Sequence, residues 1–167
     1  TGLPASGKST LSHELVYRLI HGHIRAFVLD GDNIRHGLNK DLGFSASDRR
    51  ENLRRVGEVA KLFVEAGILT IAAFASPYKA DRLMIRELFN EGEFIEVYLN
   101  CDLSVCEFRD PKGHYKKARK GEIKNFTGVS DPYEPPDRPE IILDTGRISV
   151  DESVDTIICC LKEKGII

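Results

Sequence analysis

The stretch TGLPASGKST, residues 1–10, decides how the rest of this chain is interpreted. Starting at Gly2, it matches the pattern G-x-x-x-x-G-K-S/T, a loop whose backbone N–H groups converge on phosphate oxygens at the start of a helix. In such a loop Lys8 reaches the β- and γ-phosphates, and the hydroxyl of Ser9 coordinates Mg²⁺. The stretch therefore predicts a binding site for a nucleoside triphosphate and Mg²⁺. Its residues are Gly2, Leu3, Pro4, Ala5, Ser6, Gly7, Lys8, Ser9 and Thr10.

The residues on either side of this loop predict its setting. Leu11, Leu15 and Leu19 recur at helical spacing, so a helix is expected to follow the loop. A strand is expected to precede it, and that strand would lie before Thr1. We therefore expect the first strand of the sheet to be missing from the sequence.

Beyond the loop, apolar runs typical of buried strands alternate with segments of helical periodicity. Strands are predicted over residues 26–29, 68–75, 94–99 and 141–143, and helices over 45–66, 81–90, 104–109 and 150–164. This order predicts one α/β domain over residues 1–167, of the P-loop NTPase type. Its mostly parallel sheet would have helices on both faces and ligands at the carboxyl ends of the strands. Residues 110–139 are polar, basic at first and then Pro-rich, and predict a mobile basic lid.

The composition excludes several functional classes. Of the 167 residues 41% are hydrophobic and 30% are charged, as in folded globular domains rather than disordered chains. Lys and Arg number 24 against 26 Asp and Glu, so no overall positive field exists to hold a nucleic acid. No apolar run is as long as a membrane span, and no secretory pattern is present. We expect a cytoplasmic protein without nucleic-acid or membrane partners, whose cysteines are buried thiols without metal-ligand spacing.

Two acidic residues follow the strand predicted at residues 26–29. Asp30 and Asp32 lie just past its carboxyl end, where this fold places reactive groups. Either carboxylate could act as a base toward an acceptor hydroxyl or hold Mg²⁺ through water. The alternative interpretation is a helix cap at Asp32 or Asn33.

Arginine and aromatic residues accompany these carboxylates. Arginine side chains bind phosphate or sulfate oxygens in a bidentate manner. Arg49 and Asn52 lie three apart on one helical face, whereas Arg50 should point elsewhere. Phe44 and Phe126 lie in polar loops, where an aromatic ring suits stacking on a purine; packing beneath the lid is the alternative.

Several segments together closely resemble the adenylylsulfate kinase (APS kinase) family: Gly2–Thr10, Leu29–Asn39, Gly43–Ser45, Arg54–Lys61 and Tyr115–Arg119. The resemblance covers essentially the whole chain. The run DGDNIRHGLN (residues 30–39) and the segment DPKG (residues 110–113) are more specific than the phosphate loop, which many kinases share. The resemblance implies transfer of the γ-phosphoryl group of MgATP to the ribose 3′-hydroxyl of adenosine 5′-phosphosulfate (APS). The products would be 3′-phosphoadenosine 5′-phosphosulfate (PAPS) and ADP.

The resemblance also implies roles for individual residues. Phe44 and Phe126 would enclose the adenine of APS, and Arg35 and Arg49 would hold its phosphosulfate. Asp32 would orient or deprotonate the 3′-hydroxyl. The family pattern gives as catalytic Lys8, Asp32, Ser76 and Lys112, and as acceptor-binding Asp32, Asn33, Ile34, Arg35, Phe44, Arg49, Asn52, Ser76, Lys112 and Phe126.

Other expectations concern chemistry and assembly. Lys112 would neutralise developing charge as the lid closes. Ser76 matches a serine described as a phosphoserine intermediate, although direct transfer is favoured here. The family resemblance implies a homodimer. The sequence leaves open whether the domain works alone, is fused to ATP sulfurylase or works with it. The alternatives are a related P-loop kinase acting on a nucleoside monophosphate or another small molecule, and a nucleotide-binding switch that transfers nothing.

Overall fold

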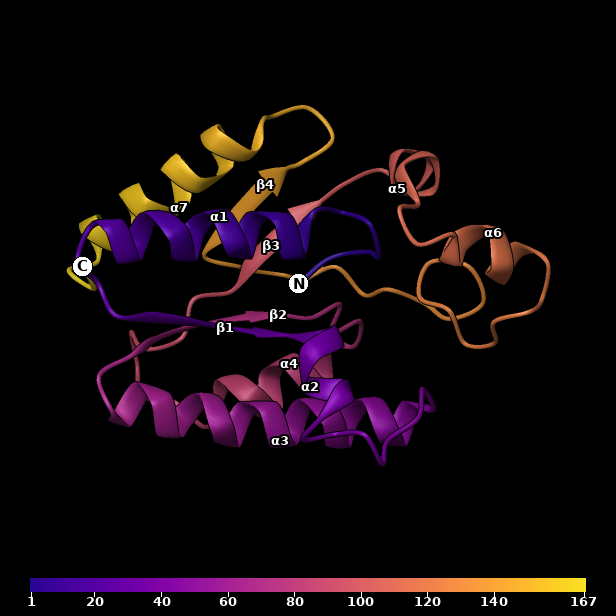
Figure 1. Ribbon diagram of the computed structural model, residues 1–167, viewed down its shortest axis with the longest axis horizontal. Helices are drawn as coiled ribbons and strands as arrows, with labels where there is room; N and C mark the ends of the chain where they lie inside the picture. The colour runs from indigo at the N-terminus through magenta and orange to yellow at the C-terminus, as the bar shows by residue number, and fades with distance from the viewer.

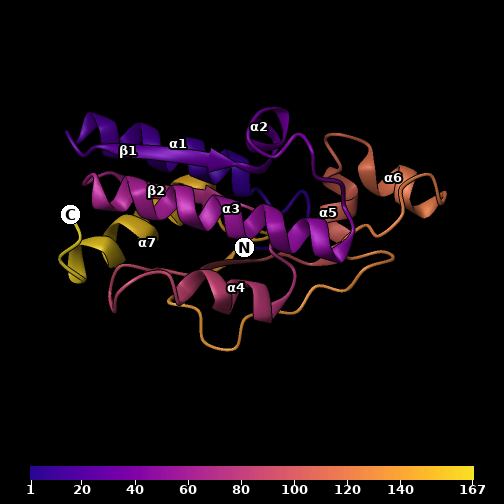
Figure 2. The ribbon, with the colours of Figure 1, turned by 90° about the horizontal axis from the view of Figure 1, so that it is seen from below.

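Four parallel strands lie between two layers of helices in the computed structural model, which describes residues 1–167 (Figure 1). The strands are β1 (Ala26–Asp30), β2 (Leu69–Ala73), β3 (Val97–Asn100) and β4 (Ile141–Asp144). One layer holds α1 (Lys8–His21) and α7 (Val150–Glu163), and the other holds α3 (Ala46–Glu65) and α4 (Lys79–Arg86). The short helices α2 (Gly31–His36), α5 (Leu103–Arg109) and α6 (His114–Arg119) lie beyond the carboxyl ends of the strands (Figures 1 and 2). The α/β fold with parallel strands and helices on both faces is confirmed.

Each helical layer encloses its own apolar core. Leu11, Leu15 and Leu19 of α1 pack with apolar residues of β3, β4 and α7. On the other side, Leu53 and Val56 of α3 pack with apolar residues at the end of β1 and after β2. A fully buried leucine contributes about 1.5–3 kcal/mol, so these stripes hold the layers against the strands. None of the helices combines the length and the hydropathy needed to cross a bilayer.

The strands form two separate pairs, β1 with β2 and β3 with β4. Thr1 joins the two pairs: it exchanges backbone hydrogen bonds with Val97 and Leu99 of β3, and its hydroxyl donates to the carbonyl of Ala75 just after β2 (2.7 Å). Behind Thr1, a mostly apolar slot of about 250 Å³ lies between β2 and the residues leading into β3.

Most predicted elements are present with shifted ends, but some expectations were wrong. The helix predicted over 81–90 runs from Lys79 to Arg86, and the strand predicted over 94–99 begins at Val97. The helix α2 was not predicted. Its N-cap is Asp30, whose side chain accepts from the amide of Asp32, so the cap expected at Asp32 or Asn33 lies two or three residues earlier. Cys159 is exposed because it lies on the outer face of α7, contrary to the expectation of four buried thiols.

The segment predicted as a lid, residues 110–139, is anchored to the rest of the domain. It contains α6, in which Tyr115 and Ala118 are buried. Tyr115 packs with Cys106 of α5. The hydroxyl of Tyr115 donates to the carbonyl of Pro4 in the phosphate loop (3.0 Å). The lid therefore has an apolar anchor of its own, which the sequence pattern did not indicate.

Candidate active site

The glycine-rich loop wraps around the start of α1. Gly7, in a left-handed conformation with φ of 100°, precedes the first residue of the helix, Lys8. A Cβ at Gly2 would lie 2.8 Å from the carbonyl oxygen of Leu99, so the loop approaches β3 more closely than a side chain allows. Just after β4, the hydroxyl of Thr145 donates to the carbonyl of Ser6 (2.8 Å). The loop thus places the positive end of the helix dipole where the motif predicts an anion site.

The ammonium group of Lys8 is folded back onto this loop. Its Nζ donates to the carbonyl oxygens of Leu3 (2.6 Å) and Gly2 (3.0 Å). Burial lowers the pKa of the Lys8 ammonium to about 8. These carbonyl bonds leave the mouth of the loop open, and Lys8 has to turn outward to meet a phosphate group.

The two acidic residues at the end of β1 have different surroundings. One carboxylate oxygen of Asp30 accepts from the hydroxyl of Ser9 (2.7 Å), and the other accepts from the amide of Asp32 (2.9 Å). The carboxylate of Asp32, by contrast, is 62% exposed and forms an ion pair with Lys112 of the lid. Asp30 is thus a structural partner of the phosphate loop, while Asp32 faces the lid across open space.

These groups line one cleft of about 860 Å³. The cleft brings together nearly all of the predicted site residues: Pro4, Ala5, Ser6, Gly7, Lys8, Ser9, Thr10, Asp32, Arg35, Phe44, Arg49, Asn52, Ser76, Lys112 and Phe126. Four predicted residues do not line it, namely Gly2, Leu3, Asn33 and Ile34. Ile34 packs instead against the core beneath α3, because its side chain lies on the inner side of α2.

The two predicted stacking residues line this cleft from different segments, Phe44 from the residues before α3 and Phe126 from the lid. Phe44 is exposed, and the guanidinium of Arg35 lies over its ring, 4.4 Å from the centroid. Phe126, from the lid, packs edge-on against Tyr115, with ring centroids 5.0 Å apart. Both rings retain surface toward the cleft, so each is available to a planar ligand.

Arg49 connects α3 with the lid. Its Nε donates to the carbonyl of Phe44 (3.1 Å), Nη1 donates to the hydroxyl of Thr127 (2.7 Å), and Nη2 donates to the carbonyl of Asn125. Its neighbour Arg50 is 65% exposed, which confirms the prediction that Arg50 points away from the helical face of Arg49 and Asn52.

Asn52, on the same face of α3, is more enclosed than its predicted role requires. It is buried, and its amide oxygen accepts from Nδ2 of the fully buried Asn39 (3.0 Å). Asn52 therefore supports the wall of the cleft as well as lining it.

Ser76 follows β2 and has a strained backbone. Its φ is +37°, which is rare for a residue with a side chain. Such outliers gather at functional sites when the surrounding structure holds them in place. Ser76 lines the cleft beside the start of the phosphate loop, where the hydroxyl of Thr1 donates to its carbonyl oxygen (3.3 Å).

The sequence interpretation did not include several residues that shape the cleft. Tyr115 and Thr127 of the lid line it, as does Arg109 of α5. Tyr78 donates to the carboxylate of Asp131 (2.8 Å) and so fastens the lid beside Arg49. These residues contact segments that are distant in the chain. The composition of the lid is the only sequence signal that could have pointed to these residues.

A phosphate loop, two strand-end carboxylates and a basic lid around one cleft define a P-loop phosphotransferase of the small-molecule kinase class. The family model "Adenylylsulphate kinase" matches residues 1–144. The chain belongs to the adenylylsulphate kinase family, and its activity is the family's: ATP-dependent phosphorylation of APS to PAPS, in sulfate activation.

Individual relatives agree with this assignment. The chain is 56% identical over 167 residues to the adenylyl-sulfate kinase of Geotalea daltonii, covering all of this chain and 82% of the relative. It is 60% identical over the same length to that of Staphylococcus haemolyticus, covering 84% of the relative. The Mycobacterium tuberculosis APS kinase, solved in complex with AMPPNP and APS, superposes with a TM-score of 0.94 at 44% identity, covering 97% of this chain and 94% of that chain.

More distant structures share the fold alone. A gluconokinase from Sinorhizobium meliloti superposes with a TM-score of 0.65 at 18% identity, covering 98% of this chain and 89% of that chain.

Proposed function

We propose that the phosphoryl group passes directly from ATP to the 3′-hydroxyl of APS, with Asp32 beside the attacking oxygen. The difference between the two strand-end carboxylates carries this proposal. Both oxygens of Asp30 are engaged by Ser9 and a backbone amide, whereas the only charged partner of Asp32 is Lys112. A lysine on the lid can turn from Asp32 toward phosphate oxygens once the substrates enter. Asp32 is then free to accept the proton of the hydroxyl.

In this step, a bond forms between the 3′-oxygen and the γ-phosphorus, and the bond from that phosphorus to the β–γ bridging oxygen breaks. ADP leaves with the electron pair, and the hydroxyl proton passes to the carboxylate of Asp32. Phosphoryl transfer requires little covalent chemistry from the protein. Its main tasks are to align the 3′-hydroxyl with the γ-phosphorus and to neutralise the charge on the phosphate oxygens. Lys8 and Lys112 supply positive charge from the phosphate loop and from the lid, respectively.

Mg²⁺ fits the oxygen donors at the start of α1. The hydroxyl of Ser9 and a carboxylate oxygen of Asp30 lie 2.7 Å apart, and both are the hard ligands that Mg²⁺ prefers. We propose that Ser9 holds the ion directly and that Asp30 holds it through water. When bound there, Mg²⁺ neutralises charge on the β- and γ-phosphate oxygens.

The acceptor site follows from the opposite walls of the cleft. Phe44 and Phe126 provide two aromatic surfaces for the adenine ring, and Arg35 and Arg49 provide guanidinium donors for the phosphosulfate. In the free enzyme both arginines bond to backbone carbonyls, Arg35 to that of Gly43 (2.8 Å). When the acceptor binds, the two arginines would exchange these backbone carbonyls for oxygens of the ligand. Binding of the acceptor and closure of the lid would then occur in one step.

Ser76 acts in this proposal as a contact to the acceptor rather than as a phosphorylated intermediate. Its hydroxyl has only a long bond to the carbonyl of Phe74 (3.5 Å), and no base lies within hydrogen-bond distance to activate it. Ser76→Ala should therefore retain transfer. A burst of labelled protein from γ-labelled ATP in the absence of APS would contradict direct transfer.

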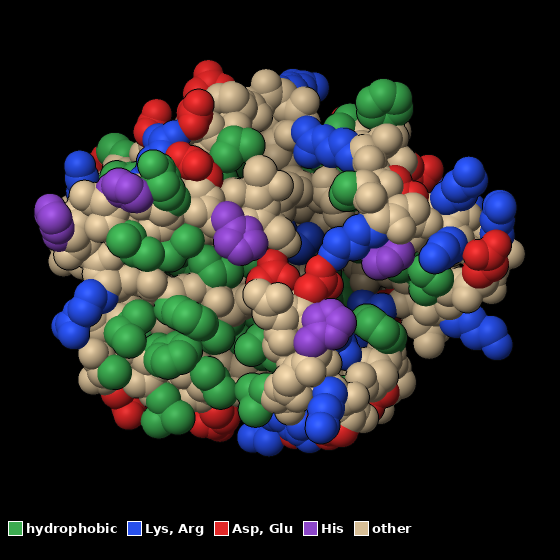
Figure 3. Space-filling view, viewed as in Figure 1, with side chains coloured by type: hydrophobic (Ala, Val, Ile, Leu, Met, Phe, Trp, Pro, Cys, Tyr) green, Lys and Arg blue, Asp and Glu red, His purple; other side chains and the backbone are tan.

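We also propose that the chain forms one domain over residues 1–167, with its lid at 110–139, and works as a cytoplasmic homodimer. Hydrophobic side chains gather over β1 and α3 on one face (Figure 3). Among them, Phe27 and Leu62 are exposed, and Phe27 packs against Phe63. Such a patch supports self-association, as well as a contact with ATP sulfurylase. Sedimentation equilibrium of the protein and of Phe27→Asp tests the homodimer, which the substitution should weaken.

The experiment that tests the reaction is an incubation with MgATP and APS in which ADP and PAPS are measured. AMP, gluconate and shikimate are supplied in parallel as acceptors. The expected result is PAPS from APS and no product from the other acceptors. Equal transfer to AMP would contradict the proposed acceptor site, because AMP has the adenine but lacks the sulfate that Arg35 and Arg49 are proposed to bind.

A further inference from the structure

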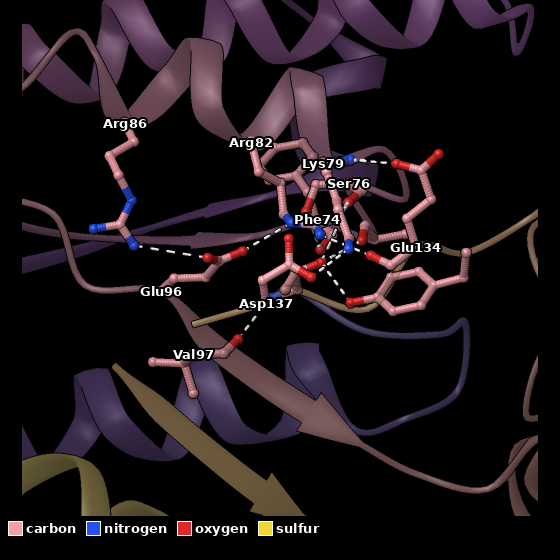
Figure 4. A network of polar contacts seen from close by, with 12 residues as sticks. Phe74, Ser76, Lys79, Arg82, Arg86, Glu96, Val97, Glu134 and Asp137 are labelled. Carbon is pink, nitrogen blue, oxygen red and sulfur yellow. Dashed lines mark hydrogen bonds and ion pairs between the residues drawn. The ribbon is translucent and has the colours of Figure 1, made fainter. Parts of the chain in front are cut away.

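Arg82 of α4 lies behind the cleft, with its side chain only 7% exposed. Its Nη1 donates to the carbonyl oxygen of Ser76 (2.7 Å), and its Nη2 donates to the carbonyl oxygen of Glu134 (2.7 Å). Its Nε faces the carboxylate of Glu96, also at 2.7 Å (Figure 4). One rigid guanidinium therefore holds three segments of the chain at once.

Two of these segments belong to the active site. Ser76 is the strained residue that lines the cleft, and Glu134 lies where the lid returns to the domain. The two segments are also bonded directly to each other, because the amide of Glu134 donates to the carbonyl of Pro77, the residue after Ser76 (2.8 Å). The side chain of Glu134 accepts in turn from the amide of Lys79 at the start of α4 (2.7 Å). Arg82 thus completes a junction between the loop after β2 and the root of the lid.

The third segment anchors the arginine itself. Glu96 precedes β3, and its carboxylate lies between Arg82 and Arg86, at 2.7 Å and 3.6 Å (Figure 4). This ion pair fixes the direction of the guanidinium, so its two remaining edges point at the carbonyls of Ser76 and Glu134. Arg82 does not line the cleft and cannot touch a substrate there.

We infer that Arg82 is a positioning residue for the acceptor: it holds Ser76 in its strained conformation and ties that loop to the root of the lid. The inference rests on the proposed function, in which the acceptor lies between Ser76 and the lid. Loss of the two carbonyl bonds lets the loop relax and the lid root shift, so acceptor binding suffers. Thr1 and Gly2 bond to Ala75 and Ser76, but Thr145 and Tyr115 hold the following residues of the phosphate loop. ATP binding should therefore change much less than acceptor binding.

Arg86 is a matched control, because it has similar ionic contacts without the junction. It pairs with the same Glu96 and donates twice to the carboxylate of Glu140 (2.7 and 2.8 Å). It makes no bond to Ser76 or Glu134. Arg86 is more exposed than Arg82, 34% against 7%, so the melting temperature of each variant is compared as well. A purely structural role of Arg82 would lower the melting temperature without a selective change in the KM for APS.

The experiment compares Arg82→Lys and Arg82→Met with Arg86→Lys and Arg86→Met. For each variant, kcat, the KM for APS, the KM for ATP and the melting temperature are measured. A lysine keeps the charge beside Glu96 but lacks the fork that reaches both carbonyls. We expect Arg82→Lys to raise the KM for APS by about tenfold or more and to lower kcat, with the KM for ATP within about twofold. Arg86→Lys should leave both KM values within about twofold.

Equal shifts in the two KM values, or the same kinetics in the Arg82 and Arg86 variants, would overturn the inference. If Arg82→Met does not fold, Arg82→Lys decides. Phe126→Ala in the same assay separates this inference from the proposed acceptor site. An unchanged KM for APS in Phe126→Ala contradicts the proposed site. A raised KM there, together with a normal KM in Arg82→Lys, contradicts only the role of Arg82.

Discussion

Removal of the Arg49 side chain should weaken binding of the acceptor without changing binding of ATP. The guanidinium is 14% exposed and spans the gap between α3 and the lid. It donates to the carbonyl of Phe44 (3.1 Å), to the hydroxyl of Thr127 (2.7 Å) and to the carbonyl of Asn125. None of these partners belongs to the phosphate loop. Arg49→Ala should therefore weaken lid closure and acceptor binding while the nucleotide site remains intact.

The size of the effect follows from the bonds that are lost. A hydrogen bond from a charged donor contributes about 1.5–3 kcal/mol, and contacts made by one group are not additive. If one or two of these bonds persist in the transition state, their loss raises the activation free energy by roughly 2–4 kcal/mol. Since each 1.36 kcal/mol is a factor of about ten, kcat/KM for APS should fall by roughly 30- to 900-fold. The KM for ATP should stay within about twofold.

Arg50→Ala is the control for this measurement. Arg50 is the next residue on α3, is 65% exposed, and has Asp81 as a charged partner at 3.8 Å. The carboxylate of Asp81 is buried, but Arg50 lies beyond hydrogen-bond distance of it and does not line the cleft, so this variant should keep nearly full activity. The assay follows ADP release against APS concentration at saturating ATP, and then the reverse. A kcat/KM for APS in Arg49→Ala within about threefold of that in Arg50→Ala would refute the reasoning.

Further outcomes are expected for four other residues. Lys8→Ala should reduce kcat by at least about 10²- to 10³-fold, since it removes charge at the β- and γ-phosphates; near-normal turnover would contradict the phosphate-loop assignment. Asp32→Asn should lower kcat much more than it changes the KM for ATP, and a change in the KM for ATP alone would exclude its role as base. Asn39→Ala leaves the buried amide of Asn52 without its partner, which should cost about 1–3 kcal/mol and lower the melting temperature by about 2–4 °C per kcal/mol. Hydrogen bonds from two neighbouring arginines lower the pKa of the Glu51 carboxyl to about 2, below its value in the unfolded chain. The ionised carboxylate therefore stabilises the folded protein fully above about pH 4.5, and this stabilisation is lost as the pH falls toward 2. Thermal melts of Glu51→Gln and the unchanged protein should therefore differ at pH 7 and converge as the pH falls.

The parts of this protein that depend on local sequence could be predicted. The phosphate loop is encoded by consecutive residues, and the stripe of Leu11, Leu15 and Leu19 shows the helix that follows it. Gly67, with φ of +69°, ends α3 where the pattern placed the stop. In these cases one short segment contains both the signal and its physical cause.

The parts that depend on distant contacts could not be predicted in the same way. The helix α6 was missed because its stability comes from burying Tyr115 against α5, not from periodicity. The burial of Asn52 depends on Asn39, which belongs to a different turn of the chain. Lys112 and Asp32, 80 residues apart, were both predicted as site residues, but their pairing in the free enzyme has no sequence signal.

Selectivity for the acceptor cannot come from the elements that this fold shares with kinases of other substrates. A gluconokinase that is 18% identical to this chain shares its fold, with a TM-score of 0.65, so the fold by itself does not select the acceptor. What remains is the pair of segments that face each other across the cleft, residues 31–55 and 110–134. They are joined in the free enzyme by Lys112 to Asp32 and by Arg49 to Thr127. In the proposed function, an acceptor that enters replaces these contacts with its own charges, so recognition of the phosphosulfate and closure of the lid are one event. A molecule without those charges would leave Lys112 paired with Asp32, the proposed base, and no base would be available to the hydroxyl.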